Sequence, residues 1–365
     1  MRFIGWCRTL CTGFRRSLQW SSAPSDRPIH ILLSICDHYE PGNGGAPAER
    51  ADGRVRNWVE QYPKLLANFK DSDGRPPRHT FFYPIEMYRP GEVDQIAGLC
   101  RAGFGEIEVH LHHDHDTARH LRKTLLDWKQ LLRDRHGLLS RHRDTGETMY
   151  AFVHGNWALN NSRPDGRFCG VDDELEVLRE TGCYADFTFP SYPDVSQPRK
   201  INSIYYAQCD PGKPVSLDRG IDVGAAPAPQ QSLMLIQGPL IPNWKSRKFS
   251  VLPRIENGNI QGNQPPTEDR LNLWIKARVQ VASRPDWFFV KLHTHGATEH
   301  NQAVLLGGPM VRFHENLAER ARRNPNFHHH YVTAREMYNL VKAAESGWSG
   351  SVDAARDQTL IWPTG

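Results

Sequence analysis

Residues Gly105–Thr117 read GEIEVHLHHDHDT and pass from an apolar, strand-like start into a run of metal-binding side chains. Alternate residues of a strand share a face, so His110 and His112 point the same way. Asp114 joins them if the chain stays extended. Two imidazoles and a carboxylate suit a divalent transition metal, with Zn²⁺ as the first expectation. The alternative is a polar loop that leads into the next helix, but the density of histidines favours a site.

Strands and helices alternate on both sides of this stretch. Apolar and β-branched runs predict seven strands, at 29–36, 80–83, 107–112, 148–153, 184–189, 233–237 and 287–292. Most are separated by apolar residues at helical spacing. This alternation implies a parallel sheet, either open or closed into a barrel. Without a composition break or a repeat, we expect a single α/β domain with insertions.

The composition is that of a soluble globular protein. Of the 365 residues, 39% are hydrophobic and 24% are charged, and the formal net charge is only +4. No long basic run occurs, so nucleic acid is not the expected partner. No apolar stretch reaches the length of a membrane span. The seven cysteines include no Cys-x-x-Cys pair, which fits a reducing compartment and predicts a cytoplasmic location.

The first 27 residues differ from the rest of the chain. They contain several arginines and no acid before Asp26, and the arginines interrupt the apolar core that a secretory signal needs. We expect 1–27 to be a disordered or surface-associated arm that could hold the protein at a membrane. The expected domain spans 28–347, and 348–365 is expected to be a C-terminal tail.

Polar clusters follow the carboxyl ends of four predicted strands, at Asp37–His38, His110–Asp114, His154–Asn156 and His293–His295. In a parallel barrel those ends meet on one face, which carries the active site. Ordinary strand ends favour Ser, Asn, Gly and Lys, whereas all four clusters contain histidine. The sequence has no Gly-x-Ser-x-Gly, phosphate-loop or His-Glu-x-x-His motif. A single histidine-rich pocket is therefore predicted.

The order of these clusters resembles the NodB-homology polysaccharide deacetylases of the glycoside hydrolase/deacetylase superfamily. The family's Thr-Phe-Asp-Asp motif has its counterpart in Ile35–His38. The family also has two histidines separated by three residues, with Glu-Ile-Gly-Asn before the first. Glu106–His110 is similar to the first part of this motif, and Asp114 takes the place of the second histidine. Leu292–His295 resembles its Leu-x-His motif, and His154–Trp157 is a loose counterpart of its Arg-x-Pro motif.

The resemblance implies a distorted (β/α) barrel of about seven strands and a set of site residues. By this resemblance, Asp37 is the general base, and His38, His110 and Asp114 hold the metal. His295 is assigned as the acid that protonates the leaving amine. His38 stands where the family has an aspartate, and Asp114 stands where the family has a histidine. The total charge of the ligand set is therefore unchanged, so metal binding can survive.

The implied activity is metal-dependent deacetylation of an N-acetylated sugar or polysaccharide precursor. The loose Arg-x-Pro counterpart places three residues at the carbohydrate substrate, namely His154, Asn156 and Trp157. The first rival is a glycosidase on a related barrel, in which Asp37 or Glu40 acts with Asp114 or Asp116. The second rival is an inactive carbohydrate-binding protein in polysaccharide assembly.

Overall fold

The computed structural model describes residues 28–210, 212–215 and 217–363. Twelve strands within these ranges form one sheet, along the order β12-β1-β2-β3-β5-β6-β9-β7-β8. Its parallel strands are β1 (Ile29–His38), β2 (His79–Pro84), β3 (Gly105–Leu111), β5 (Thr148–His154), β6 (Cys183–Asp186), β9 (Leu233–Ile236), β12 (Trp287–Thr294) and β13 (Phe327–Tyr331). Its antiparallel strands are β4 (Ser140–His142), β7 (Ile204–Ala207), β8 (Ile221–Asp222) and β14 (Leu360–Ile361).

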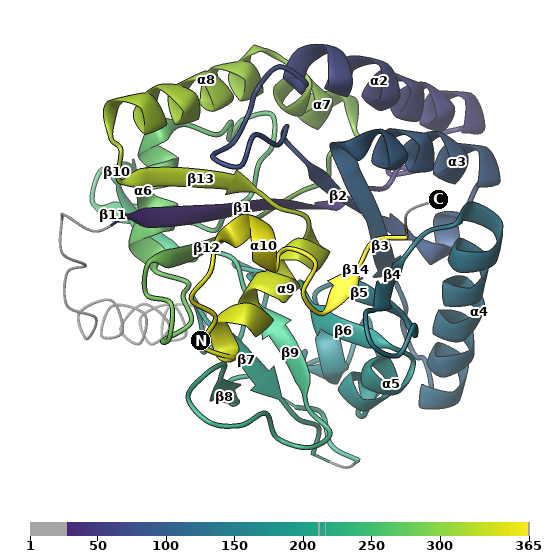
Figure 1. The fold of residues 1–365 in the computed structure, drawn as a ribbon. Coiled ribbons are helices and arrows are strands. Elements are labelled where there is room, and N and C mark those ends of the chain that lie inside the picture. The colour runs from purple at the N-terminus through teal and green to yellow at the C-terminus, as the bar shows by residue number, and fades with distance from the viewer. Residues whose placement is uncertain (1–27, 211, 216, 364–365) are drawn as a thin grey trace.

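Helices surround the strands (Figure 1), and a separate hairpin is formed by β10 (Ile241–Lys248) and β11 (Leu252–Glu256). In the view of Figure 1, α8, α7, α2, α3, α4 and α5 follow one another around the periphery. The α-helices are α2 (Ala48–Leu66), α3 (Pro90–Leu99), α4 (Ala118–His136), α5 (Glu174–Glu180), α6 (Glu268–Ala277), α7 (Glu299–Leu305), α8 (Gly308–Arg323), α9 (Ala334–Glu345) and α10 (Val352–Ala355). The described residues also include three short helical turns, namely η1 (Ile85–Met87), η2 (Cys100–Phe104) and η3 (Leu159–Asn161).

The predicted α/β fold with a mostly parallel sheet is confirmed. Each of the seven predicted strands overlaps a strand of the structure, from β1 to β12. Across the described ranges, no strand ladder joins β12 to the far end of the sheet. Closure into a barrel therefore stays a prediction.

The predictions for the two ends of the chain compare differently with the structure. The predicted arm at 1–27 lies outside the described residues. Within the predicted tail, the sequence showed no pattern, but the structure has α10 and β14 there, and β14 pairs with β4. Arg356 of this segment is fully buried and lies 2.7 Å from Asp73. No helix in the described ranges is both long and apolar enough to cross a bilayer.

Side-chain alternation along β1 separates two apolar clusters on opposite faces of the strand. Leu33 and Ile35 belong to the cluster that includes apolar residues of α2 and α3, whereas Cys36 belongs to the cluster on the other face. Because successive strand residues point to opposite faces, His38 continues the Cys36 face and Asp37 continues the Ile35 face. This alternation decides which polar residues at the end of β1 can meet.

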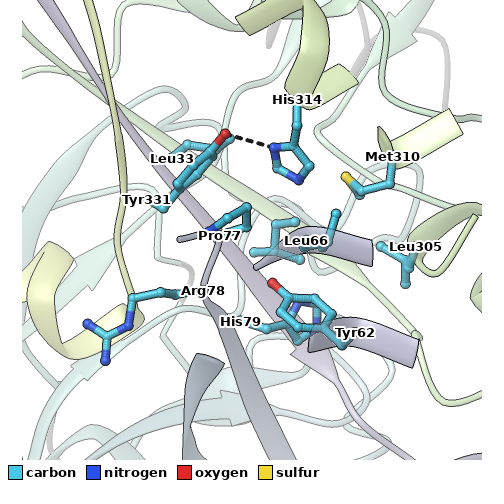
Figure 2. A pocket seen from close by; sticks show the side chains of 11 residues that line it. Leu33, Tyr62, Leu66, Pro77, Arg78, His79, Leu305, Met310, His314 and Tyr331 are labelled. Carbon is cyan, nitrogen blue, oxygen red and sulfur yellow. Dashed lines mark hydrogen bonds between the residues drawn. The ribbon is translucent and has the colours of Figure 1, made fainter. Parts of the chain in front are cut away.

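A small cavity lies between β1, α2, α8 and β13, and His314 lines it among apolar side chains such as Leu66 and Met310 (Figure 2). His314 Nδ1 lies 2.9 Å from the hydroxyl of Tyr331. Burial, with a smaller contribution from the nearby His329, lowers the pKa of His314 to about 3. His314 is therefore neutral in the folded protein at any pH above that value.

This buried histidine predicts a loss of stability in mild acid. The unfolded chain takes up a proton at His314 near pH 6.5, whereas the folded chain does not until about pH 3. Stability is complete above pH 6.5 and falls as the pH drops, by on the order of 2 kcal/mol at about pH 5 from this group. The variant His314→Gln keeps an acceptor for Tyr331 but cannot ionise, so it should lose less stability between about pH 7.5 and pH 5. Urea unfolding at both pH values measures the difference, and equal losses in the two proteins would contradict the assignment.

Candidate metal centre

The carboxyl ends of β1 and β3 bring His38, Glu40 and His110 together, and we call these three residues the metal centre. One ligand atom from each lies within 4.8 Å of the others, and all three side chains are buried. His110 Nε2 is 3.1 Å from Glu40 Oε1, and the ring centroids of His38 and His110 are 4.8 Å apart. The centre thus gathers two imidazoles and one carboxylate away from bulk water.

The contact at Nδ1 of His110 decides which ring nitrogen carries the proton. Its Nδ1 lies 3.0 Å from the carbonyl oxygen of Val153, which can only accept a hydrogen bond. With the proton on Nδ1, Nε2 presents a lone pair to Glu40 Oε1, which is also an acceptor. Two acceptors in contact require a proton or a metal cation between them. A backbone carbonyl that orients the ring in this way is typical of metal-binding histidines.

The charges of the other two residues also fit a metal. Burial and the neighbouring histidines hold the pKa of His38 well below its usual value, so this imidazole is neutral. Its Nδ1 has no hydrogen-bond partner among the described residues. Burial alone would raise the pKa of Glu40, but a proton held by His110 at their contact outweighs it and lowers the pKa to about 2 when no metal is bound. Neutral imidazole and carboxylate are the ligand forms that a divalent metal binds.

Two partly exposed histidines border the metal centre. The ring centroids of His295 and His38 are 4.8 Å apart. His112 Nε2 is 3.6 Å from Glu40 Oε1, while its Nδ1 contacts Glu86. Burial alone would lower the pKa of His112, but the hydrogen bond and charge of Glu86 raise it. Burial lowers the pKa of His295. The pKa values of the two rings are therefore shifted in opposite directions beside the same centre.

Asp37 lies on the opposite face of β1 from His38. Its Oδ2 is 2.9 Å from His79 Nε2, and its Oδ1 accepts a hydrogen bond of 2.6 Å from the backbone N–H of Gly296. A Cβ at Gly296 would approach Asp37 Oδ2 to 2.1 Å, so the turn after β12 needs a glycine for this contact. Asp37 thus holds the turn that carries His295, and its role as general base stays a prediction.

The structure does not bring Asp114 to the metal centre. Asp114 Oδ1 accepts hydrogen bonds from the backbone N–H groups of His115 and Phe168. Glu40 stands in the place that the sequence analysis gave to Asp114. The sequence contains one signal for it, because Glu40 follows His38 at i+2, the spacing at which strand residues share a face.

The three predicted substrate-binding residues lie at the end of β5. Asn156 and Trp157 are partly exposed, whereas His154 is fully buried. His154 Nδ1 accepts a long contact of 3.2 Å from the backbone N–H of Asn156. Its Nε2 lies 3.8 Å from Glu174 Oε1. Substrate binding by these residues stays a prediction.

Comparisons with known proteins give little further information. The sequence matches no family model, and it matches no curated protein. Among solved structures, the chain is similar to one described as a putative polysaccharide deacetylase from Mycobacterium smegmatis. The two share 13% sequence identity over 88% of this chain and 93% of that chain, with a TM-score of 0.44. The function is therefore argued from the residues of the site.

Proposed function

We propose that this protein is a metal-dependent hydrolase that removes the acyl group from an N-acetylated sugar. The observation that carries the proposal is the contact between His110 Nε2 and Glu40 Oε1, two acceptors that a proton or a metal cation must bridge. The order of the motifs along the sequence supports a carbohydrate substrate and a distorted (β/α) barrel. Zn²⁺ suits the two imidazoles and one carboxylate.

In this proposal, His38, Glu40 and His110 hold the metal, and the neighbouring side chains manage protons. A bound metal with an open position would polarise the acyl carbonyl and lower the pKa of a bound water. The neutral ring of His295 can accept a proton from the attacking water and return it to the leaving amine. The cationic ring favoured for His112 can stabilise negative charge on the acyl oxygen.

In this proposal Asp37 positions His295, and His295 takes the base role that the resemblance gave to Asp37. Its carboxylate binds the backbone N–H of Gly296, directly after His295, and thereby fixes where the His295 ring stands. Asn156 and Trp157 are available to contact the sugar, since an aromatic ring can stack on a sugar face. These assignments combine the resemblance seen in the sequence with the placement of each side chain.

The test is an acetate-release screen on N-acetylated sugars and oligosaccharides, with metal-stripped and zinc-reloaded protein. We expect acetate release that is lost on stripping and regained with Zn²⁺. Cleavage of glycosidic bonds without acetate, insensitive to chelation, would instead show the glycosidase. Saturable sugar binding with neither product would show a carbohydrate-binding protein, and either result would contradict the proposal.

A further inference from the structure

A second group of metal-ligating side chains lies beside the metal centre but shares no residue with it. The second group consists of His113, His154, Cys169 and Glu174, and one ligand atom from each lies within 4.8 Å of the others. Three of its members are fully buried, and the side chain of His113 is only 6% exposed. His113 lies in the β3–α4 connection and His154 ends β5, while Cys169 lies in the segment before α5 and Glu174 is the first residue of α5.

Cys169 supplies the sulfur of the second group. The backbone N–H groups of Asn161 and Val171 point at its Sγ, at 3.3 and 3.4 Å. Burial and the charge of Glu174 raise the pKa of this thiol, so it is protonated without a metal. A bound metal would displace the proton, since the thiolate is the form that binds metals. The thiol donates a hydrogen bond to Glu174 Oε2 at 3.4 Å, so the sulfur and the carboxylate already stand close enough to share a cation in place of that proton.

His113 has the orientation of a metal ligand. Its Nδ1 lies 3.2 Å from Asp116 Oδ2, and its Nε2 lies 3.0 Å from Glu174 Oε1. Metal-binding histidines commonly face a carboxylate with the nitrogen that does not bind the metal. Asp116 faces Nδ1 without a hydrogen bond of good geometry, and Nε2 is directed toward Glu174 in the second group.

His154 supplies an unpartnered nitrogen. Its Nε2 is buried, has no hydrogen-bond partner in the described part of the chain, and lies 3.8 Å from Glu174 Oε1. A buried polar atom without a partner is costly and calls for an explanation. Metal binding at Nε2 would supply one, and it would place the ring proton on Nδ1. The long contact from the Asn156 amide would then be given up.

We propose that the second group binds a Zn²⁺ ion with a structural role. Two histidines, a cysteine and a glutamate fill the four positions of a tetrahedral zinc site and leave none open for a substrate. The ion would tie the end of β3 to the segment between β5 and α5. That segment holds Trp157, Asn160, Asn161 and Phe168 at positive φ. Such backbone conformations persist only where their surroundings enforce them.

The test uses the full chain, stripped of metal and reloaded with Co²⁺ alone. The metal centre contains no sulfur ligand, so a thiolate-to-cobalt absorption band reports the second group alone. We expect the band in the wild-type protein and its loss in Cys169→Ala. Cys100→Ala is the matched control, because Cys100 is also a buried free thiol but belongs to no group of potential ligands among the described residues. It should keep the band.

Metal counting gives a second measurement that does not depend on activity. Zinc-loaded wild-type protein should hold two ions per chain, and Cys169→Ala should hold one while His110→Ala loses the other. If Cys169→Ala fails to fold, the wild-type cobalt spectrum still decides. Bound Co²⁺ without a thiolate band, or a zinc count that Cys169→Ala leaves unchanged, would overturn the proposal.

Discussion

Replacing Glu40 by Gln is expected to release the metal from the metal centre and to lower acetate release by roughly 10³-fold. Lewis-acid stabilisation by a bound metal is worth several kcal/mol, and each 1.4 kcal/mol is about tenfold in rate. Gln keeps the size of the side chain but removes the charge that faces His110 Nε2 at 3.1 Å. Zinc content and the rate of acetate release measure the two effects.

Asp114→Asn is the matched control for this experiment. Asp114 is a carboxylate in the same sequence cluster, but its Oδ1 serves the backbone of Phe168 and His115. The variant should keep both zinc and turnover. Loss of zinc in Asp114→Asn with normal zinc in Glu40→Gln would restore the ligand set predicted from the sequence and contradict our assignment of Glu40.

The largest effect on stability is expected for Arg335→Met. Arg335 is buried in α9, and its guanidinium contacts both carboxylate oxygens of Glu106, at 2.8 to 3.2 Å. Glu106 is fully buried, and the nearest remaining cation is Arg78 Nη2, 3.6 Å from Oε1. Removing one partner of a buried pair leaves an uncompensated charge and costs about 3–5 kcal/mol. Urea unfolding measures this loss.

Two further variants separate charge from packing. Arg50→Met removes an arginine from an exposed ion pair with Glu299 and should leave the free energy of unfolding nearly unchanged. Combining Arg335→Met with Glu106→Gln removes the stranded charge and should recover part of the stability. A loss in Arg335→Met no larger than that in Arg50→Met would show that the Glu106 pair does not matter to the fold.

The sequence predicted the long strands well because they are apolar and buried on both faces, as in β1 and β12. The short antiparallel strands β4 and β14 carry no comparable pattern. Arg356 stands in a segment without periodicity, and its burial depends on Asp71 and Asp73, more than 280 positions earlier in the chain. Such long-range pairing leaves no local signal to read.

At the site, the direction of a side chain could be predicted for residues inside a strand but not for residues beyond its end. His38 and His110 lie within β1 and β3, where alternation fixes the face of each side chain. Asp114 was placed by assuming that the chain stays extended, but β3 ends at Leu111. His115 then takes a φ of 50°, and Asp114 binds its backbone N–H. Local turn chemistry therefore turned Asp114 away from the metal centre.

Anomalous diffraction at the zinc edge, from crystals of the zinc-loaded protein, would locate the metal in the metal centre. We expect a peak among His38, Glu40 and His110, about 2.0–2.2 Å from His110 Nε2 and from a Glu40 oxygen. A fully loaded protein that shows no peak among these three residues, or one bound through Asp114 instead of Glu40, would contradict this expectation.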